Sequence, residues 1–199
     1  MPEFTRNWVK SKWKNWEKHF SALKTQSHVN YLEIGVFEGR SVCWMFENLL
    51  IGPNAVGIGI DPYIFGKKEL MDQRQVIQQR CIDNVSSFNF SMVFRPSQEV
   101  LLEKQQEWEN RFDLIYVDGL HDCMSAYMDL RLLNRIMKKD CFVICDDYGL
   151  DLDRFNRSPY DSPKPAVDKY IEEMGEQCEV LWQELQVGLR MTKTQTKLS

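Results

Sequence analysis

Acidic side chains follow two apolar segments in the second half of the chain. Asp118 comes directly after residues 113–117, and Asp146 and Asp147 come directly after residues 141–145. If these segments are neighbouring parallel strands, the three carboxylates meet at the same edge of a sheet. Crowded like charges are unfavourable unless a cation lies among them or some of them are protonated. Such an all-oxygen set suits Mg²⁺, although a rim of ionised carboxylates without an ion is the alternative.

A histidine stands three positions after the first of these aspartates, at His121. An imidazole titrates near neutral pH and is suited to accepting the proton of a hydroxyl group. A metal ion beside it would lower the pKa of that hydroxyl and fix its oxygen for attack. His121 is therefore the candidate catalytic base, with Asp118 beside it. The alternative is a histidine that only caps the following helix.

Two glycines in the first half of the chain shape a second candidate site. Residues 30–39 read Asn-Tyr-Leu-Glu-Ile-Gly-Val-Phe-Glu-Gly, and the later run from Gly57 ends in Asp61. Gly35 and Gly39 permit a sharp turn from strand to helix, and a carboxylate at the end of the neighbouring strand reaches ribose hydroxyls. Val, Phe and Glu between the glycines leave no room for a pyrophosphate, which argues against a dinucleotide. The alternative is an ordinary turn with a surface aspartate.

The pattern E-I-G-x-x-x-G followed by Asp61 resembles the first two motifs of class I S-adenosylmethionine-dependent methyltransferases. The resemblance implies that S-adenosylmethionine is the cofactor. It implies further that Gly35 and Gly39 shape the loop that binds the amino-acid end and that Asp61 holds the ribose. Glu33 would fix the loop or the methionine amine, and Ser41 would also contact the cofactor.

The segment V-D-G-x-H-D with a later D-D-Y resembles metal-dependent O-methyltransferases. Among these, the catechol O-methyltransferase type is similar, and the small bacterial enzymes related to macrolide-sugar O-methyltransferases are more so. This implies that Asp118, Asp146 and Asp147 bind the metal, while Asp118 also approaches the cofactor amine. Ser97 and Gln98 correspond to the pair that borders adenine in that group.

This sequence also departs from the catechol type in the same region. The catechol enzymes have a lysine base where His121 falls here, and an aromatic residue against adenine where Leu120 falls. These departures argue against a catechol substrate but leave methyl transfer in place.

Apolar and helical segments alternate after the N-terminal region, which indicates a parallel sheet covered by helices. The last segment, residues 179–191, is too short for a crossover and predicts an antiparallel hairpin. We therefore expect an α/β, Rossmann-like doubly wound, mostly parallel seven-stranded sheet with a C-terminal antiparallel hairpin. The other expected strands are residues 30–34, 55–60, 91–95, 113–117 and 141–145, and the expected helices lie near residues 40–50, 67–80, 97–108, 122–138 and 165–174.

Residues 1–28 are basic and carry an apolar stripe at helical spacing. The stripe comprises Val9, Trp13, Trp16, Phe20 and Leu23, among the cations Arg6, Lys10, Lys12, Lys14, Lys18 and Lys24. We expect an extra N-terminal amphipathic helix that packs on the sheet or on a second subunit, with a substrate lid or an anionic surface contact as alternatives. The expected division is a 1–28 helix, acting as lid or oligomer contact, and a 29–199 methyltransferase domain. A homodimer is a candidate arrangement.

The longest stretch without a clear pattern is residues 149–165, which contains three prolines. Loops of this length in compact domains are often lids over a site. Arg154, Arg157 and Tyr160 in this loop are candidates for recognising an acidic or phosphorylated acceptor.

Bulk properties exclude several classes. The net charge of −4 gives no general attraction to nucleic acid, no apolar run reaches the length of a membrane span, and the six cysteines have no zinc spacing. We expect a cytoplasmic enzyme, of the type EC 2.1.1.-, that methylates a hydroxyl of a small molecule with the help of Mg²⁺. The alternatives are a metal-independent N- or O-methyltransferase and a non-catalytic binding protein with this fold.

Overall fold

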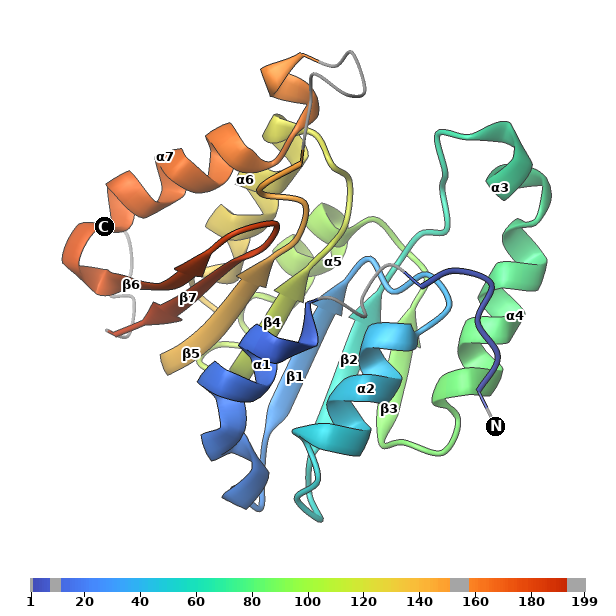
Figure 1. Cartoon of the computed structure of the whole chain (residues 1–199), viewed down its shortest axis with the longest axis horizontal. Coiled ribbons are helices and arrows are strands. Elements are labelled where there is room, and N and C mark those ends of the chain that lie inside the picture. Colours follow the sequence, from blue (N-terminus) through green and yellow to red (C-terminus); the bar gives the residue numbers. More distant parts are fainter. Residues whose placement is uncertain (1, 8–11, 151–157, 193–199) are drawn as a thin grey trace. The chain divides into compact units, whose positions relative to one another are not determined.

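The computed structural model describes residues 2–7, 12–150 and 158–192. Two compact units make up the chain, residues 1–96 and residues 97–199. The predicted boundary after residue 28 is a different division and stays a prediction. Each unit has strands and helices of its own, as Figure 1 shows.

The first unit contains three parallel strands in the order β3-β2-β1. They are β1 (Asn30–Ile34), β2 (Val56–Ile60) and β3 (Phe90–Val93), which agrees closely with the predicted ranges. In the register of β1 and β2, Ile34 pairs with Ile60. The two strands therefore end level, and the residues that follow them, Gly35 and Asp61, emerge at the same edge.

Four helical segments and a short 3₁₀ turn surround these strands in the first unit. They are α1 (Trp13–Phe20), η1 (Ser21–Thr25), α2 (Arg40–Asn48), α3 (Lys68–Asp72) and α4 (Arg74–Val85). Residues 67–80, expected as one helix, are divided at Gln73 between α3 and α4, and α4 continues to Val85. Since α3 buries no side chain, it gains little from packing and stays short.

The aromatic stripe of the N-terminal helix packs within the first unit. Trp16 and Phe20 are fully buried, and Leu23 is nearly so. The rings of Trp13 and Trp16 each lie 5.4 Å from the ring of Trp44 in α2, one stacked and one edge-on. This contact accounts for the stripe inside a single chain, while Val9 lies outside the described residues. A lid role and a homodimer contact stay predictions.

The second unit contains four strands in the order β4-β5-β7-β6. They are β4 (Phe112–Val117), β5 (Met137–Cys145), β6 (Cys178–Gln183) and β7 (Val187–Met191). β4 and β5 are parallel, whereas β7 pairs antiparallel with both β5 and β6, as the predicted hairpin requires. Because Val117 pairs with Cys145, Asp118 and Asp146 leave neighbouring strands at the same level.

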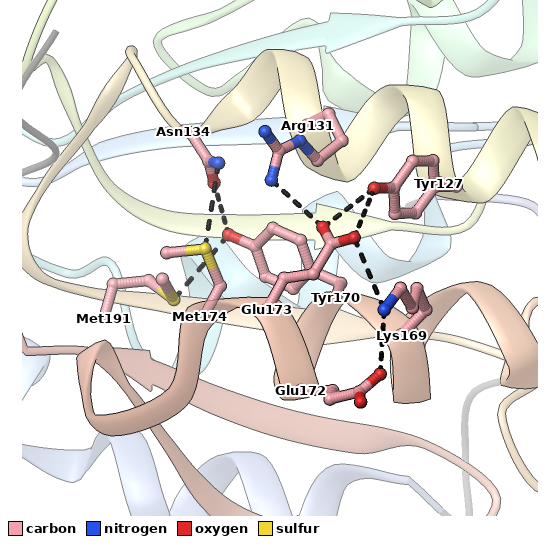
Figure 2. Close-up of polar contacts among 9 residues, drawn as sticks. All are labelled: Tyr127, Arg131, Asn134, Lys169, Tyr170, Glu172, Glu173, Met174 and Met191. Atoms are coloured by element: carbon pink, nitrogen blue, oxygen red, sulfur yellow. Dashed lines mark hydrogen bonds and ion pairs between the residues drawn. The ribbon is translucent and has the colours of Figure 1, made fainter. Parts of the chain in front are cut away.

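The helices of the second unit are α5 (Ser97–Lys104), α6 (Cys123–Leu133), η3 (Pro159–Asp161), α7 (Lys164–Met174) and η4 (Gly175–Gln177). Figure 2 shows the polar contacts between α6 and α7. Glu173 of α7 accepts hydrogen bonds from Tyr127 at 2.8 Å and from Arg131 at 3.1 Å, while the buried Tyr170 donates to Asn134. α6 ends at Leu133 and β5 begins at Met137, so the helix is shorter than the predicted range to residue 138.

Part of the predicted lid loop lies outside the described residues, including Arg154 and Arg157. Tyr160, in η3, has an exposed fraction of 72%. No helix in the described part of the chain is both long and apolar enough to cross a membrane.

Candidate functional site

The glycine loop between β1 and α2 has an unusual backbone conformation. Gly35, Phe37 and Gly39 have φ angles of 82°, 51° and 77°. Positive φ is easy for glycine and strained for phenylalanine. A Cβ at Gly39 would also lie 2.7 Å from the Val85 side chain, so this position accepts glycine alone. The loop is a strained turn that other groups must hold in place.

Asp61 is one of the groups that hold it. One carboxylate oxygen accepts hydrogen bonds from the backbone N–H groups of Val36 and Phe37, both at 2.9 Å. The other oxygen accepts from the N–H of Tyr63 at 2.7 Å. Burial raises the pKa of Asp61 above its ordinary value, and the three backbone hydrogen bonds oppose that shift. The residue therefore connects the ends of β1 and β2, and the predicted ribose contact stays a prediction.

Tyr63 is a member of this cluster that the sequence analysis missed. It is buried, has a φ angle of 52°, and donates a hydrogen bond from its hydroxyl to the carbonyl of Phe37 at 2.8 Å. The loop carbonyl and the loop N–H groups are thus held by neighbouring residues of one segment. Its place two residues after Asp61 is the signal that was available in the sequence.

Glu33 connects β1 to the first turn of α2. It is fully buried, and its carboxylate accepts hydrogen bonds from the hydroxyls of Tyr31, at 2.5 Å, and Ser41. Ser41 is itself buried. The structure therefore brings the two predicted residues, Glu33 and Ser41, together. Of the two roles predicted for Glu33, this geometry suits that of fixing the loop.

The predicted adenine pair, Ser97 and Gln98, lies at the start of α5. Both side chains donate hydrogen bonds to a third residue. The hydroxyl of Ser97 and the amide of Gln98 donate to the same oxygen of Asp129, at 2.7 and 2.8 Å. Asp129 lies on α6 with an exposed fraction of 2%, and burial raises its pKa to about 7. The sequence analysis missed Asp129 because nothing in the spacing of α6 separates it from an ordinary polar helix residue.

The aspartates after β4 and β5 converge on a tyrosine. The hydroxyl of Tyr116 lies 3.2 Å from an Asp118 oxygen and is hydrogen bonded to an oxygen of Asp146. The other Asp146 oxygen accepts from the N–H of Asp147 at 2.7 Å. The amide of Gln186 donates to the Tyr116 hydroxyl at 3.3 Å. Since a hydroxyl has one proton, Tyr116 serves one of the two carboxylates at a time.

His121 and Asp147 form a pair at the same edge of the second unit. The His121 Nδ1 lies 3.0 Å from an Asp147 oxygen. Asp147 has a φ angle of 54°, which belongs to the left-handed region and turns the chain directly after β5. The exposed fractions of the His121 and Asp147 side chains are 48% and 25%, so solvent reaches both. A small cavity beside this pair is lined by Asp118, His121 and Asp146 together with Pro163 and Val167.

The predicted magnesium ligands come together without forming a metal site. Among the described residues, no group of three or more His, Cys, Asp or Glu side chains is arranged to hold a metal ion. Both oxygens of Asp146 accept hydrogen bonds from protein groups, and Asp147 is paired with His121. Their chemistry suits Mg²⁺, and carboxylate oxygens that accept one hydrogen bond keep further lone pairs, so metal binding by Asp118, Asp146 and Asp147 stays a prediction.

Comparison with known proteins identifies the family. Residues 32–148, more than half of the chain, match a family described as "Methyltransferase domain". The chain belongs to this family. The matched range begins in β1 before the glycine loop and ends directly after Asp146 and Asp147. It therefore contains the glycine loop and the aspartates that follow β4 and β5.

Several individual proteins are similar to this chain. A protein described as uncharacterized protein R132 of Acanthamoeba polyphaga mimivirus is 26% identical over an alignment of 166 positions, which covers 78% of this chain and 68% of that protein. The O-methyltransferase from Bacillus cereus, solved in complex with SAH, matches 96% of this chain and 84% of its own with a TM-score of 0.62 and 14% identity. The MycE methyltransferase from the mycinamycin biosynthetic pathway, in complex with Mg and SAH, matches 92% of this chain with a TM-score of 0.62 and 14% identity. This chain spans 49% of the MycE chain. These structures confirm the predicted Rossmann-like class I methyltransferase fold.

Proposed function

We propose that this protein transfers a methyl group from S-adenosylmethionine to a hydroxyl of a small molecule. The observation that carries the proposal is the glycine loop, which Asp61 and Glu33 hold in a strained conformation in a chain of the methyltransferase family. A loop built with this many internal hydrogen bonds is preorganised for a ligand. The solved relative from Bacillus cereus has SAH, the demethylated cofactor, bound.

The cofactor contacts are proposed residue by residue. Gly35 and Gly39 allow close approach to the amino-acid end of S-adenosylmethionine, and Glu33 and Ser41 fix the loop beneath it. For Asp61, we propose a ribose hydroxyl as a further partner in addition to its three backbone donors. Ser97 and Gln98 are proposed to border adenine, in an orientation that Asp129 sets. Asp118 is proposed to approach the cofactor amine.

The acceptor chemistry is proposed for His121 and Asp147. If Asp147 accepts the proton on Nδ1, the lone pair of Nε2 is free to take the proton of the acceptor hydroxyl. The attacking oxygen gains the methyl group, the sulfonium becomes a neutral thioether, and His121 becomes positively charged beside the Asp147 carboxylate. That carboxylate lies 3.0 Å from Nδ1 and stabilises the charge.

Mg²⁺ assistance is a separate part of the proposal. The MycE structure contains Mg, whereas the carboxylates of this protein are engaged with Tyr116, His121 and backbone N–H. The pairing of His121 with Asp147 favours a second candidate, methyl transfer without a metal. Turnover measured in excess EDTA and with added Mg²⁺ separates the two, because only metal-assisted transfer loses activity in EDTA and regains it with Mg²⁺.

Calorimetry with S-adenosylhomocysteine tests the main proposal. Binding is expected at roughly 10 to 100 micromolar, the range of a free energy near −6 kcal/mol. Radiolabelled S-adenosylmethionine, incubated with a panel of sugars, phenols and other hydroxyl compounds, then identifies an acceptor. Absence of any heat with either form of the cofactor at millimolar concentration would overturn the proposal. Binding without transfer to any acceptor would instead support the non-catalytic alternative.

A further inference from the structure

An N-terminal segment, residues 2–7, lies against the glycine loop and α4. Figure 1 shows this segment in dark blue alongside α4. The backbone N–H of Glu3 donates to the Asn84 side chain, and the Asn84 amide donates back to the Glu3 carbonyl, both at 2.9 Å. The same amide donates to the carbonyl of Glu38 in the glycine loop at 2.9 Å. Asn84 therefore joins the N-terminal segment to the loop.

Glu38 is the central contact between the two. Its side chain is buried, with an exposed fraction of 2%, although it carries a carboxylate. One oxygen accepts from the backbone N–H of Thr5 at 2.6 Å, and the other accepts from the Thr5 hydroxyl at 2.7 Å and from Arg80 at 2.6 Å. A buried carboxylate without donors is strongly unfavourable, so these contacts are required where Glu38 lies.

A further contact reaches the start of α2. Arg40, its first residue, has its guanidinium carbon 4.9 Å from the centre of the Phe4 ring. The Arg40 guanidinium also lies 3.4 Å from the carbonyl of Arg6. Residues on both sides of Thr5 thus contact the groups that flank Gly39.

We propose that residues 2–7 form an N-terminal strap that keeps the glycine loop in the conformation that binds the cofactor. In this view Thr5 and Glu38 are positioning residues for cofactor binding. The inference rests on the function proposed above and goes beyond it, because no predicted cofactor contact includes the strap. Glu38 lies between Phe37 and Gly39, whose φ angles are both positive, so the strained part of the loop is attached directly to it.

The strap and Asp61 hold neighbouring parts of the strained loop. Asp61 holds the N–H groups of Val36 and Phe37, whereas the strap holds the next side chain, Glu38. Loss of the strap contacts removes the Thr5 donors from Glu38 while the contacts of Asp61 and Tyr63 remain, and the fraction of molecules with a binding-competent loop falls. The apparent affinity for the cofactor falls by that fraction. By linkage, bound cofactor must in turn hold the strap more firmly in place.

Two variants of Thr5 and a matched control test the proposal in the full-length protein. Thr5→Val removes the hydroxyl donor, and Thr5→Pro removes the hydroxyl and the backbone N–H together. Thr25→Val is the control, because the Thr25 hydroxyl donates to a backbone carbonyl in an exposed turn of the same unit. We expect Thr5→Val to weaken S-adenosylhomocysteine binding about threefold and Thr5→Pro about tenfold or more, as for the loss of one and two hydrogen bonds. Thr25→Val should bind like the parent protein.

Hydrogen exchange supplies a readout that general stability does not move. In Thr5→Pro without ligand, the amides of residues 36–39 should exchange faster than in Thr25→Val, while the amides of β4 and β5 stay unchanged. In the parent protein, S-adenosylhomocysteine should slow exchange at residues 3–5. Equal affinity and equal loop exchange in Thr5→Pro and Thr25→Val would overturn the strap. If the parent protein fails to bind the ligand, the proposed function fails, and the loop exchange rates without ligand still decide whether the strap holds the loop.

Discussion

The glycine loop and the acidic strand ends (Asp118, Asp146 and Asp147) both contain carboxylates at or near the ends of parallel strands, but the surroundings of these carboxylates differ. In the loop, the carboxylates of Glu33, Glu38 and Asp61 are buried and accept mostly from backbone N–H groups and hydroxyls, which keep their protons at every physiological pH. At the acidic strand ends, Asp147 is partly exposed and pairs with the imidazole of His121, whose side chain is 48% exposed. The loop carboxylates are therefore fixed by several buried donors, whereas the pair of His121 and Asp147 is open to solvent.

This difference matches the two tasks of a methyltransferase. A cofactor of constant shape is best held by a rigid, preorganised loop, since ordering the loop on binding would reduce affinity. Proton transfer requires a group whose hydrogen bonds change during the reaction. The comparison therefore predicts that changes in the loop alter binding and stability, while changes at the acidic strand ends alter turnover.

The largest expected effect is that of His121→Ala on turnover. Loss of a general base lowers the rate by about 10²- to 10⁴-fold. S-adenosylhomocysteine affinity should stay within about twofold of the parent value, because the role proposed for His121 is to act on the acceptor and not on the cofactor. Single-turnover rates with labelled S-adenosylmethionine and calorimetry measure the two quantities. His28→Ala is the control, because His28 is exposed and its Nδ1 lies 2.8 Å from the hydroxyl of the neighbouring Ser27. Equal rates for the two variants would remove His121 from the mechanism.

Asp61→Ala should have the next largest effect, on stability and binding together. Its removal leaves the N–H groups of Val36, Phe37 and Tyr63 without their acceptor. Buried donors that lose a partner cost about 1 to 3 kcal/mol each, and partial solvation of the loop reduces the sum to about 3 kcal/mol. Urea unfolding measures this loss. Asp83→Ala, which removes an exposed hydrogen bond with Gln79 on α4, should change the free energy of unfolding by less than about 1 kcal/mol.

Tyr116→Phe tests the acidic strand ends, because it removes the hydroxyl between Asp118 and Asp146. We expect a loss of about 1 to 2 kcal/mol in the free energy of unfolding, smaller than for Asp61→Ala, because the carboxylates beside the cavity can take up water instead. Tyr127→Phe removes a hydroxyl that bonds Glu173 on the surface and should cost less still (Figure 2). A loss for Tyr116→Phe as large as that of Asp61→Ala would show that the acidic strand ends are as rigid as the loop.

Much of this arrangement could be predicted from local sequence. Apolar runs that end in Gly35, Asp61, Asp118 or Asp146 mark strand ends, and within each unit parallel pairing brings two such ends to the same level. Partners far apart in sequence could not be predicted, because no local pattern connects them. Glu38 meets Thr5 across 33 positions, for example. Tyr116 reads as one more apolar residue of a buried strand, and its hydroxyl contacts depend on strand register.

A pH-dependent effect concerns Asp129, a helix carboxylate that is buried like those of the loop. Burial raises its pKa in the folded protein to about 7, while Ser97 and Gln98 oppose the shift. A raised folded pKa means that the folded state holds the proton more tightly than the unfolded state. The stabilising contribution is therefore complete below pH 4 and is lost as the pH rises through 7.

Asp129→Asn should remove this pH dependence, because asparagine keeps an oxygen for Ser97 and Gln98 but carries no charge. Relative to the variant, the parent protein should lose up to about 1.4 kcal/mol of stability per pH unit between pH 5 and 7, and no more above pH 8. Urea unfolding of both proteins at several pH values measures the difference, with Asp140→Asn as an exposed control. A constant difference would show that the Asp129 carboxylate stays ionised throughout, stabilised by the Ser97 and Gln98 donors.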